Sequence, residues 1–103
     1  MPPTWAPEHL VLSGLLDCSL TSLRYHALRY GIAVEAGGSA RGSITKRESD
    51  GRYGFVEIEV RFEIALDPKP DQAQIADLLM KAERDCFVGA SLTPSPSYIW
   101  TVA

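Results

Sequence analysis

The chain has 103 residues, a net charge of −3 at neutral pH and a hydrophobic fraction of 46%. This length predicts a single domain with one core, and the hydrophobic fraction excludes an intrinsically disordered chain. The acidic balance, with Lys and Arg scattered along the sequence, disfavours nucleic acid as a partner.

Residues 1–7 lack the basic and apolar segments of a signal peptide, and no segment reaches the roughly 18 apolar residues of a membrane span. The sequence therefore predicts a cytoplasmic protein with no membrane partner. Because thiols stay reduced in the cytoplasm, Cys18 and Cys86 are expected to be free. They are interpreted either as redox-active thiols or as small buried hydrophobic residues.

The first predicted element is a helix over residues 8–30. Pro7 and Glu8 suit its first turn, and Gly31 supplies the stop. Apolar residues fall on two neighbouring faces of this helix, so it is expected at the centre of the fold. These residues are Val11, Leu12, Leu15, Leu16, Cys18, Leu20, Leu23 and Ala27.

A β-hairpin is predicted next. Ile32, Val34 and Ala36 alternate with polar residues, and Asp50-Gly51 has the composition of a turn. The return strand has the clearest alternation in the sequence, with one face predicted to meet the core and an acidic face interpreted as a solvated surface. A weak cation site on that acidic face is the less favoured alternative. The core-facing residues are Val56, Ile58, Val60, Phe62, Ile64 and Leu66, and the outward-facing ones are Glu57, Glu59, Arg61 and Glu63.

After a break at residues 67–70, residues 71–86 return to helical spacing, and a short turn leads to a last strand over residues 98–102. The sequence therefore predicts an α+β domain with the order helix-strand-strand-helix-strand. Its sheet is expected to be antiparallel or mixed and to pack around the long first helix. Three strands and a helix apolar on two faces cannot cover one another in a chain of this size. A homodimer with the first helices packed together is therefore expected.

Cys18, Cys86 and Glu8 suggest redox chemistry. A thiolate attacks a peroxide, and a second thiol captures the sulfenic acid that results. A carboxylate in such a site usually holds an arginine that stabilises the thiolate. Ten residues of straight helix span about 15 Å, so Glu8 can reach Cys18 only through a kink or from a partner subunit.

The predicted position of Cys86 at the negative end of a helix means that the helix dipole gives its thiol no help toward ionisation. This favours Cys86 as the resolving thiol and Cys18 as the attacking one. A metal site built from Cys18, Cys86, His9 and His26 is disfavoured, because the spacing lacks the short ligand pairs typical of zinc sites.

Pro7-Glu8, then Cys18 within an apolar helix, a long alternating strand, and a helix ending in Asp85-Cys86-Phe87-Val88 resemble the OsmC/Ohr family of thiol peroxidases. The family takes its names from osmotically inducible protein C and the organic hydroperoxide resistance protein, and the resemblance covers nearly the whole chain. It implies an OsmC-like fold in an intertwined homodimer. It also implies organic hydroperoxides or hydrogen peroxide as substrates and small or protein-bound dithiols as reductants, with no cofactor.

The resemblance implies a role for each site residue. Cys18 matches the peroxidatic cysteine, Cys86 the resolving cysteine, and Glu8 the carboxylate that orients the family's arginine. That arginine comes from strands ahead of the Pro-Glu motif, whereas this sequence begins six residues before Pro7 and has no matching position. The substitutes that the sequence offers are Arg24, Arg41, Arg52 and Arg61, and none is assigned.

The sequence therefore leaves two functions open. The first is a dithiol peroxidase that uses Cys18 and Cys86. The second is a catalytically impaired, dimeric binding or stress-response module in which both cysteines are structural.

Overall fold

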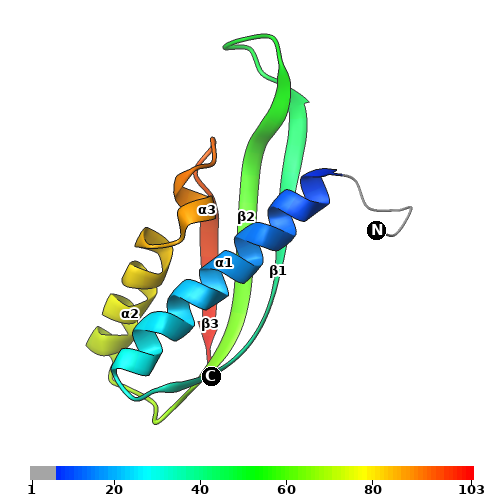
Figure 1. Ribbon diagram of the computed structural model, residues 1–103. Coiled ribbons are helices and arrows are strands. Elements are labelled where there is room, and N and C mark those ends of the chain that lie inside the picture. The colour runs from blue at the N-terminus through cyan, green and yellow to red at the C-terminus, as the bar shows by residue number, and fades with distance from the viewer. Residues whose placement is uncertain (1–6) are drawn as a thin grey trace.

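The computed structural model describes residues 7–103 and has six regular elements (Figure 1). Their order is the predicted one, except that a short helix, α3, takes the place of the predicted turn after the second long helix. The elements are α1 (Pro7–Arg29), β1 (Ala33–Lys46), β2 (Tyr53–Asp67), α2 (Gln72–Arg84), α3 (Phe87–Ala90) and β3 (Ser97–Val102).

The three strands form one mixed sheet in the order β1-β2-β3. β1 and β2 are antiparallel neighbours joined by the predicted hairpin, whereas β3 pairs with β2 in parallel. A parallel neighbour requires a crossover connection, and here α2 and α3 form it. In Figure 1, α1 crosses in front of the strands and α2 lies beside its carboxyl-terminal half, so the helices cover one face of the sheet.

The core lies between this sheet face and the helices. The alternation of β2 is confirmed over most of its length, because five of its six predicted core residues are buried. The helices α1 and α2 each add a buried stripe at helical spacing, as their sequences predict. The core residues from these three elements are Ile58, Val60, Phe62, Ile64, Leu66, Leu12, Leu15, Leu23, Ala27, Ile75, Leu78 and Ala82.

The sixth predicted core residue of β2, Val56, is 42% exposed, so that part of the prediction was wrong. The register of the hairpin shifts at this point, because Ser43 pairs with Glu57 and Ile44 with Phe55. Val56 is therefore the extra residue of a β-bulge, which reverses the alternation beyond it. As a result Phe55, not Val56, packs against the core.

The prediction that α1 is apolar on two sides is confirmed. Leu15 and Leu23 are fully buried, whereas Val11, Tyr25 and Leu28 are exposed to 37%, 58% and 77%. Val11, Cys18 and Tyr25 follow one another at intervals of seven residues and Leu28 follows Tyr25 by three, so they share one face of the helix. Among the helices of residues 7–103, none is long and apolar enough to cross a membrane.

Candidate active site

The two cysteines lie far apart in the sequence, and the fold brings them together beside α1. Cys18 lies in the middle of α1 and is partly exposed, whereas Cys86 lies between α2 and α3 and is fully buried. Both are free thiols. The Cys18 side chain is one of the groups that lower the pKa of Cys86, so the two predicted redox residues are neighbours.

The structure corrects the predicted place of Cys86. Helix α2 ends at Arg84 with Asp85 as its C-cap, and Cys86 is the N-cap of α3. Its sulfur accepts a hydrogen bond from the backbone N–H of Gly89 at 3.4 Å. Cys86 therefore lies just beyond α2 rather than within its last turn, and the contacts that favour its ionisation are hydrogen bonds, which the prediction from the helix dipole did not include.

Two hydroxyls lie in the environment of the Cys86 sulfur, one from the buried Ser19 and one from the partly buried Tyr98. The Oγ atom of Ser19 lies 3.3 Å from Cys86 Sγ and 3.2 Å from the hydroxyl oxygen of Tyr98. Ser19 also donates to the backbone carbonyl of Leu15 at 2.8 Å, which fixes its side chain on the inner face of α1. Three elements, α1, α3 and β3, therefore meet at one sulfur atom.

These contacts determine the ionisation of the cluster. Burial raises the pKa of the Cys86 thiol, because the thiolate loses its water. The hydrogen bonds of Ser19 and Gly89, together with those of Cys18 and Tyr98, more than offset burial, so the pKa lies below that of an ordinary thiol. Burial, with the charge of Cys86, raises the pKa of Tyr98 to about 12, so this phenol keeps its proton at neutral pH.

A cavity of about 510 Å³ opens beside Cys18. Tyr25 and Phe87 contribute aromatic rings to it and are largely exposed, at 58% and 81%. A partly exposed thiol in such a cavity is accessible to a small organic molecule, whereas the buried Cys86 is not. The lining residues are Cys18, Thr21, Ser22, Tyr25, Asp85 and Phe87.

Asp85 connects this cavity to the helices. One of its carboxylate oxygens lies 2.7 Å from Nε2 of His26, and its two oxygens accept hydrogen bonds from Arg84 at 2.9 Å. Arg84, followed by His26, lowers the pKa of Asp85 to about 2. Through its contact with His26, the ionised carboxylate of Asp85 links the segment that contains Cys86 to the carboxyl-terminal half of α1.

Glu8, the third predicted site residue, is in the first turn of α1. Figure 1 shows α1 as one straight helix, so the kink that would bring Glu8 to the thiol is not present. The ten residues between Glu8 and Cys18 span about 15 Å along the axis. Within one chain the structure therefore does not bring these two side chains together.

The arginines that the sequence offered as substitutes lie elsewhere. Arg41 and Arg61 both bind the carboxylate of Glu59, at 2.9 and 3.0 Å, on the sheet face opposite the core. Arg24 and Arg52 are exposed. Within the described range 7–103, no arginine lines the Cys18 cavity.

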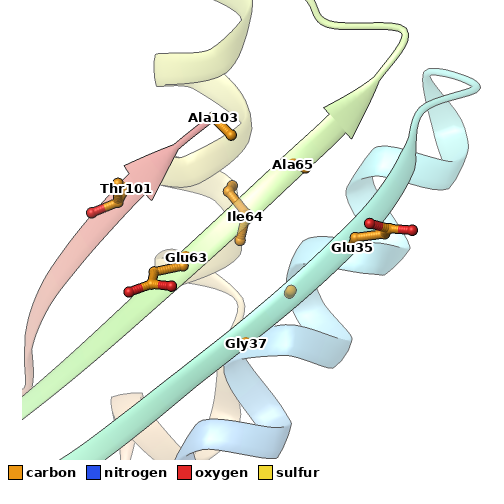
Figure 2. A pocket seen from close by; sticks show the side chains of 8 residues that line it. Glu35, Gly37, Glu63, Ile64, Ala65, Thr101 and Ala103 are labelled. Carbon is orange, nitrogen blue, oxygen red and sulfur yellow. The ribbon is translucent and has the colours of Figure 1, made fainter.

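The outer face of the sheet has a separate, shallow hollow of about 490 Å³ that spans β1, β2 and β3 (Figure 2). Glu35 and Glu63 border it from neighbouring strands. Over residues 7–103, His, Cys, Asp and Glu side chains nowhere gather in threes that could hold a metal ion. His26, which the metal alternative required, pairs with Asp85 instead.

Sequence reasoning missed Ser19 and Tyr98. Ser19 offered a usable signal, because it follows Leu15 by four residues and so places a hydroxyl on the buried face of a helix. Tyr98 offered none, because its position depends on the parallel pairing of Tyr98 with Val60, which only the folded sheet defines.

Comparison with known proteins gives a consistent result. A family model described as OsmC-like protein matches residues 2–101. An OsmC-like protein of unknown function from Vibrio cholerae has a TM-score of 0.78 and 18% sequence identity, over 94% of this chain and 63% of that chain. This chain therefore spans less than two thirds of that protein's length.

Two further solved structures share the fold. The OsmC-like protein of Mycoplasma pneumoniae has a TM-score of 0.76 and 20% identity, over 100% of this chain and 77% of that chain. The organic hydroperoxide resistance protein OhrB of Bacillus subtilis has a TM-score of 0.65 and 21% identity, over 94% of this chain and 69% of that chain. None of the curated proteins compared with the sequence matches it.

Proposed function

The chain belongs to the OsmC-like protein family, and we propose that it is a thiol-dependent peroxidase that uses Cys18 and Cys86. The observation that supports this proposal best is the difference between the two neighbouring thiols. Cys18 borders a cavity, whereas Cys86 is buried, hydrogen-bonded and lowered in pKa. One thiol is thus placed to meet a substrate and the other to react with the first.

The proposed reaction has two steps in the protein. The Cys18 thiolate attacks the peroxide, the O–O bond breaks, an alcohol or water leaves, and Cys18 becomes a sulfenic acid. The Cys86 sulfur then attacks the Cys18 sulfur, an S–S bond forms, and the sulfenic oxygen leaves as water. An external dithiol, small or bound to a protein, reduces the disulfide and restores both thiols.

Organic hydroperoxides are the favoured substrates, with hydrogen peroxide as the second choice. The Cys18 cavity has aromatic rings from Tyr25 and Phe87 in its lining, which suit the organic group of such a substrate. A cytoplasmic location belongs to the same proposal, since the reaction requires a dithiol reductant that returns the cysteines to their reduced state.

A homodimer is also part of the proposal. The face of α1 that includes Cys18 also displays Val11, Tyr25 and Leu28, which are exposed in the single chain. A second copy packed on this face would cover these side chains and close the cavity. Glu8 enters the site in this proposal from the second copy, because one straight helix keeps it about 15 Å from the Cys18 of its own chain.

A second candidate function has one observation in its favour. Among residues 7–103, no arginine lines the Cys18 cavity, so the described part of the chain offers no guanidinium to the attacking thiolate. A charge-assisted partner of this kind is a strong stabiliser of a thiolate. Its absence favours the alternative, a binding or stress-response module with structural cysteines.

Mass spectrometry of the reduced protein after one equivalent of an organic hydroperoxide distinguishes the two functions. If the protein is a peroxidase, a Cys18–Cys86 disulfide should form rapidly. In Cys86→Ser, a sulfenic acid on Cys18 should be trapped by a dione reagent, and Cys18→Ser should leave Cys86 unmodified. Thiols that stay reduced for minutes would instead support the alternative module.

A further inference from the structure

The buried state of Cys86 creates a problem of proton transfer. Cys86 and Ser19 both have no exposed surface. A thiol in water passes its proton to the solvent when it ionises, whereas the Cys86 thiol has only its hydrogen-bond partners. One of these partners is Oγ of Ser19, which lies 3.3 Å from the sulfur.

The geometry at Ser19 suits two hydrogen-bond arrangements. A serine hydroxyl has one proton to donate and two lone pairs that accept. While it donates to the Leu15 carbonyl at 2.8 Å, its oxygen is free to accept from the thiol of Cys86 and from the hydroxyl of Tyr98. Rotation about the Cβ–Oγ bond redirects the same proton from the carbonyl to the sulfur.

We propose that Ser19 and Tyr98 are positioning residues that let the buried Cys86 alternate between thiol and thiolate. In the thiol form, Ser19 donates to Leu15 and accepts from Cys86. In the thiolate form, Ser19 donates to the sulfur, while Tyr98 continues to donate to the Ser19 oxygen, which no longer accepts from a thiol. This inference rests on the proposed function for its purpose, although the hydrogen-bond exchange itself requires no peroxide.

The charged and titratable groups around the cluster agree with this assignment. The four groups that lower the pKa of Cys86 are the uncharged donors Ser19, Gly89, Cys18 and Tyr98. On α2, the Glu83 carboxylate accepts from the indole N–H of Trp100 at 2.8 Å and raises the pKa of Tyr98. Next to Cys86 in the sequence, Asp85 is held by Arg84 and His26. The hydroxyls are therefore the groups whose removal should change the ionisation of Cys86.

In the proposed cycle this exchange accompanies disulfide formation. The Cys86 thiol proton passes to the sulfenic oxygen of Cys18, and the sulfur electron pair forms the bond to the Cys18 sulfur. The S–O bond of the sulfenic acid breaks, and its oxygen leaves as water. The sum is one thiol and one sulfenic acid converted to one disulfide and one water, with no further reactant.

The test is the pH titration of the Cys86 thiolate by its ultraviolet absorbance in a Cys18→Ser background, with the matching variant that also carries Cys86→Ser as the baseline for the tyrosines. Absorbance requires no reagent, so it reports the ionisation of a thiol that has no exposed surface. Ser19→Ala and Tyr98→Phe should each move the midpoint of the titration to higher pH. For Ser19→Ala the shift should be roughly one pH unit, because a hydrogen bond to a charged group is lost.

Ser22→Ala is the matched control. Ser22 is also buried on α1, and its hydroxyl is without a hydrogen-bond partner among the described residues. Its removal should leave the midpoint unchanged. The proposal is overturned if Ser19→Ala keeps the original midpoint or if Ser22→Ala moves the midpoint equally. Should Ser19→Ala fail to fold, Tyr98→Phe decides, because it deletes one oxygen and retains the ring that stacks near Trp100.

Discussion

Asp85 joins the two helices that hold the candidate site, and its ionisation affects stability in a defined pH range. Its pKa is about 2 in the folded chain, below the ordinary value of 3.8, because Arg84 and His26 bind the carboxylate. A lowered carboxyl pKa adds stability that is complete above the unfolded pKa and disappears as the pH falls through the folded pKa. For Asp85 this loss falls between about pH 4 and pH 2.

We therefore expect Asp85→Asn to lower the thermal unfolding midpoint at neutral pH. The difference between this variant and the original chain should narrow between about pH 4 and pH 2, where the original carboxylate becomes protonated. Thermal unfolding monitored by circular dichroism from pH 7 to pH 2 measures this difference in unfolding midpoint. Asp17→Asn, which removes an exposed carboxylate on α1, is the control. A difference that stays constant over the whole range would contradict the assignment.

The sequence was sufficient to identify both cysteines as candidate site residues, but not to predict which residues contact them. The chain has only two cysteines, so Cys18 and Cys86 could each be identified by residue type and position. The contacts of Ser19 and Tyr98 depend on how α1, α3 and β3 meet, and no local pattern encodes that meeting. For the same reason, the help that Cys86 receives toward ionisation could not be derived from its place along the chain.

At the scale of elements, two glycines in β1 allow the sheet to pack closely against aromatic rings. A Cβ atom on Gly38 would lie 2.6 Å from the carbonyl oxygen of Arg61 and 2.7 Å from a ring carbon of Phe62. A Cβ atom on Gly42 would lie 2.7 Å from ring carbons of Phe55. These glycines, which interrupt the alternation in the sequence, are therefore required by the packing of β2.

We expect Gly38→Ala to destabilise the chain by roughly 1–3 kcal/mol, because the neighbouring backbone must shift to admit the methyl group. Gly37→Ala is the matched control, since a Cβ there meets nothing within 4 Å. It should be neutral or stabilising by up to about 1 kcal/mol. Denaturant unfolding gives both values, and equal stabilities for the two variants would argue against the close packing.

The elements themselves could largely be predicted. Strong helix boundaries at Pro7 and Gly31 and the clear alternation of β2 depend on local chemistry, and the structure agrees with both. The β-bulge at Val56 could not be predicted, because it is a property of the pairing between two strands. The parallel direction of β3 could not be predicted from local sequence patterns either, because it depends on the pairing of β3 with β2.

At the scale of the whole molecule, the exposed face of α1 is the feature that one chain leaves uncovered. We expect the protein to sediment with the mass of two 11.3 kDa chains. Leu28→Asp should weaken the dimer roughly tenfold or more, because it places an unpaired charge in the proposed interface. Met80→Asp, on the exposed side of α2, is the control and should leave the mass unchanged. A single-chain mass for the original protein would refute the dimer.

The parallel pairing of β3 with β2 has a consequence for the order of folding. The hairpin of β1 and β2 closes a short turn, so its entropic cost is small, whereas pairing of β3 with β2 closes a loop over residues 68–96 at a larger cost. We therefore expect β3 to pair after the hairpin has formed. Tyr98 belongs to this late strand. The Cys86 sulfur therefore acquires its full set of donors at the last stage of folding, and partly folded chains hold the same two thiols without the environment that distinguishes them.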